Sequence, residues 1–257
     1  MRIEGKVVLI TGASDGIGAA CADAFRKRGA RLSLTARNEA RLRTVGGPEA
    51  LVTAGDITLA ETRQAAVERT IERFGAVDIL INNAGMGLYA PASQTLPEDA
   101  RRLFELNFFA PLEMAQLVVP HMRAQRSGVI VNISSVAGKM TLPWFTLYSA
   151  SKYALGSLTD GLRMELARDG INTMTVCPAY VQTNFQQHAI GPGPPAKVAR
   201  GKQFAITPAE CAQAIVRGVE RGARTVMAPK AAWLMVLAER LFPRLVDAQL
   251  AAILNDV

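Results

Sequence analysis

The chain is poor in the residues that form disulfides and bind metals, with three cysteines and two histidines among 257 residues. Cys21, Cys177 and Cys211 all lie in apolar stretches, their number is odd, and none belongs to a CxxC pair. This pattern favours reduced, buried thiols over a disulfide framework. His121 and His188 are far apart in the sequence and have no ligand-spaced partners, so we expect no metal site.

The sequence also lacks any apolar run close to the roughly 20 residues that a membrane-spanning helix needs. Its first apolar run, Val7 to Ile10, is too short for the core of a signal peptide, and no cleavage-like site follows it. We therefore expect a cytoplasmic protein. The net charge is +7, but the basic residues are spread along the chain without a recognition motif, so we expect a solvated basic surface and no nucleic-acid partner.

Short apolar, β-branched runs alternate along the chain with longer helical patterns. This alternation is typical of an α/β fold in which helices cover both faces of a parallel sheet. We predict a Rossmann-type, doubly wound, seven-stranded parallel sheet, and no linker divides residues 1–257 into separate domains. The predicted strands are Lys6–Thr11, Arg31–Ala36, Leu51–Ala54, Val77–Asn82, Val129–Ser134, Ile171–Cys177 and Thr225–Met227. The predicted helices are Gly16–Arg28, Leu59–Phe74, Pro97–Gln125, Leu147–Arg168 and Pro208–Gly222.

Two segments interrupt the alternation. Residues 184–206, the lid segment, are rich in glycine and proline between Gly191 and Pro195, so we interpret them as a lid or substrate-specificity loop. Residues 230–257, the C-terminal extension, are helical and apolar in their first half. Its charges and Pro243 exclude a membrane span. An amphipathic helix there would cover a partner subunit or make peripheral contact with a membrane surface.

A glycine-rich loop joins the first predicted strand to the first predicted helix. Glycines at this position let the backbone turn tightly and approach a pyrophosphate, and the helix N-terminus offers free N–H groups to the anion. The sequence therefore predicts a dinucleotide-binding catalytic domain. The cofactor contacts expected in this loop come from Gly12, Ser14, Asp15, Gly16, Ile17 and Gly18.

The end of the second predicted strand lies where a dinucleotide fold places the adenosine ribose. An acidic residue there would hold the 2′-hydroxyl of NAD, whereas an arginine suits the 2′-phosphate of NADP. Arg37 occupies this position and no acid does, which favours NADP(H) over NAD(H). Asp15 argues in the other direction, because it adds negative charge nearby.

Tyr148 and Lys152 begin a long helical pattern at a spacing of four residues. This spacing places the two side chains on one helix face, one turn apart. A neighbouring ammonium favours the phenolate and lowers the pKa of a tyrosine, so that the phenol can donate or accept a proton near neutral pH. The pair therefore predicts acid–base chemistry, although such spacing alone is common.

Further motifs stand in order along the chain between Lys6 and Met227. They are Thr11–Gly18 (TGxxxGxG), Asn82–Gly85 (NNAG), Asn107, Ser135 thirteen residues before Tyr148, and Pro178–Thr183 (PGxxxT with Ala179 in place of glycine). With these motifs in one register, the chain resembles the short-chain dehydrogenase/reductase family in its compact single-domain form.

The resemblance implies a catalytic set of Asn107, Ser135, Tyr148 and Lys152. Tyr148 would be the general acid in reduction, Lys152 would lower its pKa and hold the nicotinamide ribose, Ser135 would bind the substrate oxygen, and Asn107 would hold a water for proton relay. The resemblance also implies cofactor contacts from Asp56, Ile57, Asn83, Ala84, Gly85, Tyr148, Lys152, Pro178, Val181 and Thr183. Three alternatives stay open: Ser134 in place of Ser135, a helix kink at Asn107, and a helix cap at Asp56 or Thr58.

Apolar and aromatic side chains are frequent in the segments expected to face the nicotinamide. A pocket of this kind favours a bulky apolar ketone, aldehyde or secondary alcohol, although the same side chains suit the core or a subunit contact. The residues are Met86, Leu88, Tyr89, Met140, Leu142, Trp144, Phe145, Tyr180 and Phe185.

Two other functions are compatible with parts of this pattern. A 3-ketoacyl-carrier-protein reductase is one alternative function, but its chains usually end soon after the seventh strand, whereas thirty residues follow Met227 here. A nonenzymatic dinucleotide sensor is another, but such proteins tend to lose the tyrosine or the lysine. The resemblance also implies a homodimer or homotetramer.

Overall fold

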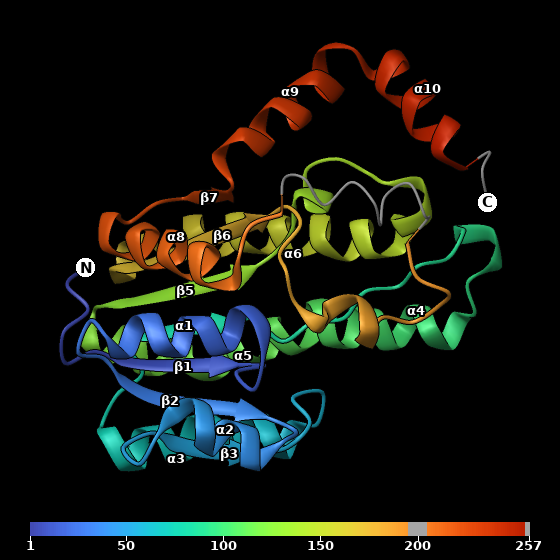
Figure 1. Cartoon of the computed structure of the whole chain (residues 1–257). Helices are drawn as coiled ribbons and strands as arrows, with labels where there is room; N and C mark the ends of the chain where they lie inside the picture. The colour runs from blue at the N-terminus through green and yellow to red at the C-terminus, as the bar shows by residue number, and fades with distance from the viewer. Residues whose placement is uncertain (195–204, 255–257) are drawn as a thin grey trace.

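The computed structural model describes residues 1–194 and 205–254. Its centre is one seven-stranded sheet in the order β3-β2-β1-β4-β5-β6-β7, and every pair of neighbouring strands is parallel (Figure 1). This arrangement confirms the predicted doubly wound fold. The strands are β1 (Val7–Thr11), β2 (Arg31–Ala36), β3 (Leu51–Ala54), β4 (Ile79–Asn82), β5 (Gly128–Ile133), β6 (Ile171–Pro178) and β7 (Thr225–Ala228).

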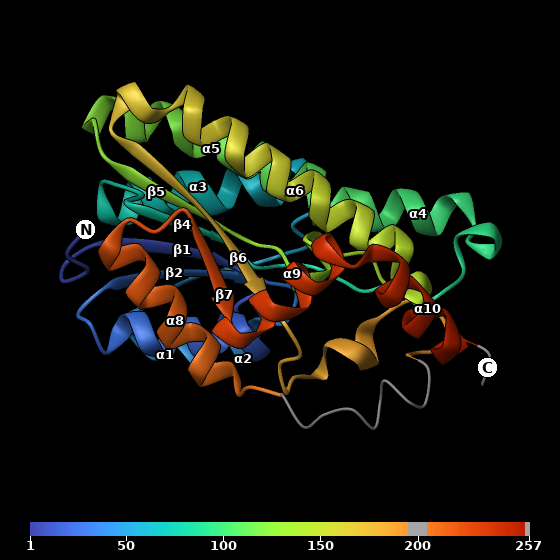
Figure 2. The same cartoon turned by 90° about the horizontal axis from the view of Figure 1, so that it is seen from above.

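Helices cover both faces of the sheet (Figures 1 and 2). The helices are α1 (Gly16–Arg26), α2 (Glu39–Gly46), α3 (Ala60–Phe74), α4 (Pro97–Phe104), α5 (Ala110–Gln125), α6 (Thr146–Glu165), α8 (Pro208–Arg221), α9 (Trp233–Leu241) and α10 (Pro243–Leu254). Alternate residues of β1 point to opposite faces: Val8 and Ile10 pack in one core cluster, with α1, α2 and α8, while Leu9 packs in the other, with α3 and α5.

The structure corrects the predicted helices at two places. The helix predicted over residues 97–125 is divided into α4 and α5 by a π-helical turn at Glu105–Phe109, which contains Asn107. A helix that the sequence did not suggest, α2, follows β2. Only Leu42 and Gly46 of α2 are buried, so its apolar pattern is weak, and its start is set by Asn38, whose side chain accepts a hydrogen bond from the backbone N of Arg41.

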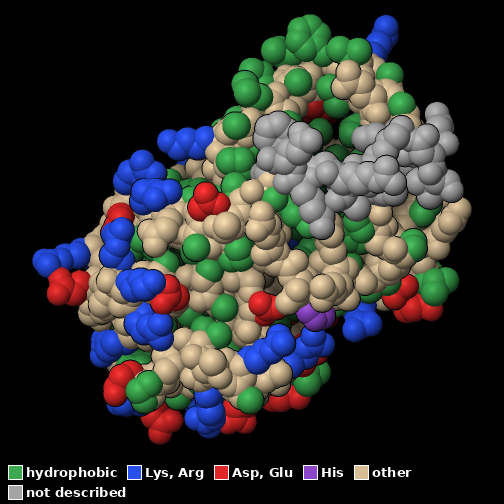
Figure 3. All heavy atoms as spheres, viewed as in Figure 1, with side chains coloured by type: hydrophobic (Ala, Val, Ile, Leu, Met, Phe, Trp, Pro, Cys, Tyr) green, Lys and Arg blue, Asp and Glu red, His purple; other side chains and the backbone are tan. Residues whose placement is uncertain are grey.

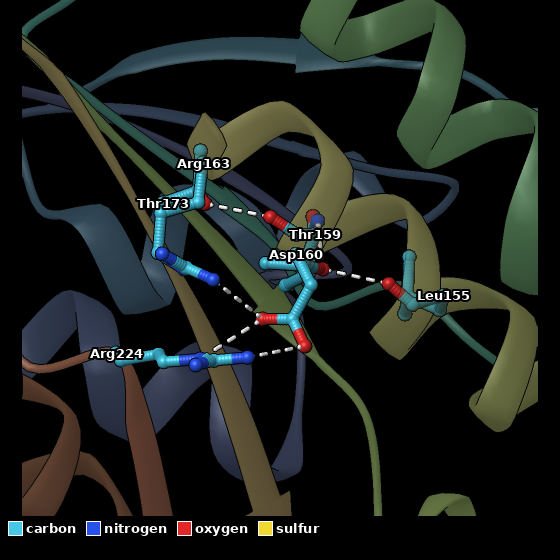
Figure 4. A network of polar contacts seen from close by, with 7 residues as sticks. Leu155, Thr159, Asp160, Arg163, Thr173 and Arg224 are labelled. Atoms are coloured by element: carbon cyan, nitrogen blue, oxygen red, sulfur yellow. Dashed lines mark hydrogen bonds and ion pairs between the residues drawn. The ribbon is translucent and has the colours of Figure 1, made fainter. Parts of the chain in front are cut away.

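Polar contacts fix the second half of α6 to the sheet (Figure 4). Asp160 accepts hydrogen bonds from both ends of the Arg224 guanidinium at 3.2 and 2.9 Å, and Arg163 lies 3.6 Å from the same carboxylate. Thr173 of β6 donates a hydrogen bond to the backbone oxygen of Thr159 at 2.8 Å. Because α6 carries both Tyr148 and Lys152, these contacts hold the candidate catalytic helix in register with β6 and β7.

The C-terminal extension forms two helices instead of one. In Figure 1, α9 rises away from the sheet and α10 returns over the start of α6. Part of the lid segment also has regular structure, since residues 184–188 form a 3-10 turn and Leu88 pairs with Ile190 in a parallel bridge. The rest of the predicted lid, residues 195–204, lies outside the described residues.

The three cysteines are free and buried, as predicted from their positions. Within residues 1–194 and 205–254, none of the helices combines the length and apolar character needed to cross a bilayer.

Candidate active site

The glycine-rich loop between β1 and α1 leaves no room for side chains along its inner surface. Gly12 has a φ of +64°, and a Cβ atom there would lie 2.8 Å from the Ala84 Cα. A Cβ atom on Gly18 would lie 2.3 Å from the Gly12 carbonyl oxygen. Asp15 caps α1 by accepting a hydrogen bond from the Gly16 backbone N at 2.7 Å. A bare loop that opens a helix fits the pyrophosphate of a dinucleotide.

Thr11 and Asn83 join this loop to the end of β4. The Asn83 side chain donates hydrogen bonds to the backbone oxygens of Thr11 and Gly12, both at 3.0 Å. The Thr11 hydroxyl accepts hydrogen bonds from the backbone N–H groups of Asn83 and Ala84, both at 3.0 Å. Asn83 therefore sets the shape of the phosphate loop. The hydroxyl of Thr11 was not singled out from the sequence, although Thr11 begins the motif.

A cavity of about 620 Å³ opens beside the start of α1. Its lining combines the phosphate loop and α1 with residues 180–184 and the start of α8: Asp15, Gly16, Ala19, Tyr180, Gln182, Thr183, Asn184 and Pro208. The two parts lie close together, because the Asn184 side chain donates a hydrogen bond to Asp15 at 2.9 Å. This bond contributes most to lowering the pKa of Asp15. Of the other predicted loop residues, Ser14 and Ile17 are half-buried.

Basic side chains lie at the end of β2 and in the following helix α2. Arg37 is exposed directly after β2, and its charge acts on Asp56, which follows β3. Burial acts to raise the pKa of Asp56, but two hydrogen bonds from Thr58, at 3.0 and 2.8 Å, together with Arg37, lower it on balance. Arg41 of α2 lies 3.8 Å from the Asp15 carboxylate. Arg41 was missed because α2 itself was not predicted.

Asp56 and Thr58 do not cap a helix, since α3 begins at Ala60 with Leu59 in the cap position. The next predicted cofactor residue, Ile57, is buried, and its backbone oxygen accepts a hydrogen bond from Arg63 at 2.8 Å. Arg63 is itself buried and forms an ion pair with Glu113 of α5. This pair fixes the loop expected beside the adenine.

The structure distinguishes the two serines at the end of β5. The Ser134 hydroxyl is buried and donates a hydrogen bond to the backbone oxygen of Lys152 at 3.0 Å. Ser135 is half-buried, and its side chain hydrogen-bonds with Tyr148. The Ser135 hydroxyl also lies 3.5 Å from the backbone oxygen of Pro178, at the end of β6. Ser135 is therefore the serine that reaches the phenol.

Tyr148 is buried at the start of α6, with 6% of its surface exposed. Its pKa is raised above the ordinary value of 10.0, because burial disfavours the phenolate more than the hydrogen bond with Ser135 favours it. The sequence predicts the opposite direction, from the ammonium of Lys152 alone. The sequence correctly predicts that Tyr148 and Lys152 lie close together. The burial of Tyr148, however, decides the direction in which its pKa shifts.

Lys152 faces Tyr148, with its ammonium nitrogen 5.7 Å from the centroid of the phenol ring. The nitrogen donates a hydrogen bond to the backbone oxygen of Ile133 at 2.9 Å. Burial lowers the pKa of Lys152 from 10.5 to about 8. Gly85 lies against this group, since a Cβ atom there would be 3.4 Å from the lysine nitrogen. A lysine in this state holds or releases a proton close to neutral pH.

Asn107 is fully buried in the π-helical turn. Its side chain accepts a hydrogen bond from the backbone N of Met86 and donates one to the backbone oxygen of Met86, both at 3.0 Å. It also donates to the Ser151 hydroxyl at 3.1 Å. Asn107 therefore lies at an interruption of the helix and also makes specific hydrogen bonds. The widened π-helical turn directs its side chain at the loop that follows β4.

The predicted substrate-facing residues divide into three groups. Most belong to one apolar cluster around Tyr148, whereas Met140 packs in a neighbouring cluster and Tyr180 lines the cavity. The members of the Tyr148 cluster that the sequence predicts are Met86, Leu88, Tyr89, Leu142, Trp144, Phe145 and Phe185. Val181, just before the lid segment, pairs with Ile206 at the end of that segment. Thr183 lies near the phosphate loop, with its Cγ2 atom 3.1 Å from the place of a Cβ atom on Gly16.

The short chain dehydrogenase family pattern matches residues 6–190, which is most of the sheet and the start of the lid segment. The chain belongs to this family. A "Dehydrogenase/reductase SDR family protein 7-like" of Anopheles gambiae is 34% identical over 263 residues, covering 94% of this chain and 82% of the relative.

Two solved structures of the family contain different dinucleotides. A short chain dehydrogenase/reductase from Burkholderia phymatum in complex with NAD has a TM-score of 0.85 and 25% identity, covering 95% of this chain and 96% of its own. A short chain dehydrogenase from Burkholderia cenocepacia in complex with NADP has a TM-score of 0.82 and 29% identity, covering 97% and 99%. Family membership therefore indicates an oxidoreductase that uses a nicotinamide dinucleotide, but it does not decide between NAD and NADP.

Proposed function

We propose that the protein is an NADP(H)-dependent oxidoreductase that interconverts a bulky apolar ketone or aldehyde and the corresponding alcohol. The observation that carries the proposal is the contact between Ser135 and Tyr148, one helical turn from Lys152. Ser135, Tyr148 and Lys152 form the catalytic set, with Asn107 beside them as a positioning residue, within a single catalytic domain.

When bound, the nicotinamide supplies or accepts the hydride. In reduction, Tyr148 donates its phenolic proton to the substrate oxygen, and Ser135 donates a hydrogen bond to the same oxygen. Lys152, whose pKa is about 8, lies 5.7 Å from the centroid of the ring and returns a proton to the site. Asn107 is a positioning residue here, since it holds the backbone of Met86 beside the reacting groups.

Arg37 supports the choice of NADP(H), since it follows β2 with its side chain exposed. Arg41 adds a second cation on the same edge and neutralises Asp15, the residue that argued against a phosphate there. We expect Arg37→Asp to reduce the preference for NADPH over NADH by tenfold or more, as an order of magnitude for a lost charge-assisted contact. Titration of cofactor fluorescence with each variant measures this preference, and an unchanged ratio refutes the role of Arg37.

The apolar cluster around Tyr148 supports a bulky apolar substrate, because these are the side chains that a carbonyl carbon would meet on reaching the phenol. A panel of ketones and aldehydes of increasing size, followed by the loss of NADPH absorbance, tests both reaction and substrate class. The matched variant is Tyr148→Phe, which keeps the ring and removes the proton. Equal rates in the two proteins would exclude the mechanism, and turnover of carrier-linked 3-ketoacyl substrates alone would favour the ketoacyl reductase.

Exposed apolar side chains on α9 and α10 support a homo-oligomer. Figure 3 shows hydrophobic side chains gathered over this part of the molecule. Trp233, Leu237 and Leu241 follow one another at helical spacing with 42%, 52% and 61% of their surface exposed, while Val236 faces the core. We propose that this uncharged stripe packs against a second copy of the chain in the cytoplasm.

Light scattering after gel filtration measures the mass of the native protein and of the variant Leu237→Ser, and so tests the contact. The control is Leu59→Ser, because Leu59 is also exposed but lies at the start of α3. Dissociation of Leu237→Ser alone supports the proposal. Co-sedimentation of the native protein with anionic vesicles, lost in the same variant without a change in mass, would instead assign the stripe to a membrane surface.

A further inference from the structure

Three aromatic rings form a stack that ends on the candidate catalytic phenol. Tyr89, from the loop after β4, stacks on Phe145 with ring centroids 4.3 Å apart and an angle of 12°. Phe145, from the 3-10 turn at Pro143–Phe145, stacks on Tyr148 with centroids 4.0 Å apart and an angle of 23°. Phe145 therefore covers one face of the Tyr148 ring.

The rings at both ends of the stack are held by the lid segment. The backbone N of Tyr89 donates a hydrogen bond to the Ile190 oxygen at 2.8 Å, and the Tyr89 side chain hydrogen-bonds with Gln186. Phe185 meets the Tyr148 ring differently, edge-on, with centroids 5.7 Å apart and an angle of 63°. The Tyr148 ring is thus bordered by the stacked Phe145 ring and the edge-on Phe185 ring, and the Lys152 ammonium lies 5.7 Å from its centroid.

The C-terminal extension supports the stack from outside. Helix α10 packs on the 3-10 turn that carries Phe145, and Leu250 of α10 packs against the apolar cluster that contains Phe145 and Tyr148. The position of Phe145 thus depends on elements far apart in the sequence. The C-terminal extension supports the turn that carries Phe145, beside the candidate active site.

We propose that Phe145 is a positioning residue for Tyr148: it holds the ring in line with Ser135 and keeps water away from the phenol. The inference rests on the proposed role of Tyr148 as proton donor. A phenol ring anchored by one hydrogen bond at its edge can still tilt, and a parallel ring 4.0 Å away restricts that tilt. The same ring displaces the water that would stabilise the phenolate, which agrees with the raised pKa of Tyr148.

The test is a pH titration of the phenols by NMR after labelling with tyrosine carrying ¹³C at Cζ. The chain has four tyrosines, so four signals are expected, and the signal lost in Tyr148→Phe identifies Tyr148. We expect Phe145→Leu to make the Tyr148 phenol ionise at a pH about one unit lower, a roughly tenfold change in its ionisation constant, because water gains access to one ring face. Phe145→Met, which fills the space flexibly, is made in parallel in case the leucine variant does not fold.

Two variants separate stacking from simple packing. Trp144→Phe changes a neighbour that is buried in the same cluster but has no ring contact with Tyr148 within the described residues, so its titration should match the native protein. Phe145→Tyr keeps the ring and should restore both the native titration and kcat. In turnover, Phe145→Leu should lower kcat about tenfold with a much smaller change in KM, because it disturbs the proton donor and leaves the rest of the pocket in place.

The outcomes distinguish this inference from the proposed function. The titration needs no turnover, so a shifted Tyr148 signal in a protein that reduces no carbonyl would overturn the proposed reaction and leave the environment of the phenol as inferred. A native enzyme that is active, with Tyr148 titrating alike in Phe145→Leu, Phe145→Met and native protein, overturns the role of Phe145. A loss of activity confined to KM overturns it equally.

Discussion

Replacing Lys152 by methionine should make the protein more stable at neutral pH while removing activity. Burial lowers the pKa of Lys152 from 10.5 to about 8, so the folded protein at pH 7 carries a proton that its environment disfavours. Since each pKa unit corresponds to 1.36 kcal/mol, the cost of the buried charge is about 3 kcal/mol. Loss of the hydrogen bond to the Ile133 oxygen offsets about 1 kcal/mol of the gain. The expected net stabilisation is about 2 kcal/mol, or roughly 4–8 °C in Tm for a chain of this size.

The dependence of stability on pH provides a second test of this prediction. Between pH 8 and 10.5 the unfolded chain holds the Lys152 proton and the folded chain does not, so the native protein gains stability as the pH rises through this window. The advantage of Lys152→Met should therefore shrink as the pH is raised from 7 to 10. Urea unfolding followed by circular dichroism at both pH values measures it, with Lys230→Met, an exposed lysine, as the control. A variant that is less stable than the native protein at pH 7, or an advantage equal at both pH values, refutes the reasoning.

Three further changes test other parts of the structure. Gly12→Ala should weaken dinucleotide binding by about tenfold or more in calorimetric titration, because φ is +64° and the new Cβ would lie 2.8 Å from the Ala84 Cα. Ser135→Ala should lower kcat by about a hundredfold, whereas Ser134→Ala, which removes a buried bond to a backbone oxygen, should cost about 1 kcal/mol in urea unfolding and leave most of kcat. Thr207→Ala should cost about 1 kcal/mol in the same assay, because Thr207 and Glu210 form a capping box at the start of α8.

The strands of the sheet and their parallel, doubly wound arrangement were accessible from the sequence because their determinants are local. Each strand is a short apolar run, and a parallel pair needs a crossover, so alternation alone constrains the topology. The phosphate loop was accessible for the same reason, since Gly12 and Gly18 are needed by the backbone itself. The missed helix α2 shows the limit: it buries Leu42 and Gly46 and little else, so its sequence resembles that of a solvated loop.

Functional residues that act through other residues were harder to predict. Thr11 organises two backbone N–H groups of the segment after β4, seventy-two and seventy-three residues away. Arg63 holds the Ile57 backbone from α3 and pairs with Glu113 of α5. Neither has a spacing that a single sequence reveals, because the partner is brought close only by the packing of the sheet and its helices.

The spacing of Tyr148 and Lys152 determines their shared face but not the water around them. Phe145, at the N-terminus of α6, and Phe185 lie against the phenol ring, while Tyr89 and Leu250 pack in the same cluster. Their combined effect opposes ionisation of Tyr148 and protonation of Lys152, so both groups are held closer to neutrality than they would be in water. Because the two pKa values move apart, proton transfer from the Lys152 ammonium to a Tyr148 phenolate is favourable, whereas transfer from the neutral phenol to the neutral amine is costly. The dry enclosure therefore contributes to the acid–base chemistry as directly as the two side chains, and disturbing Phe145 or Lys152 should alter the same proton.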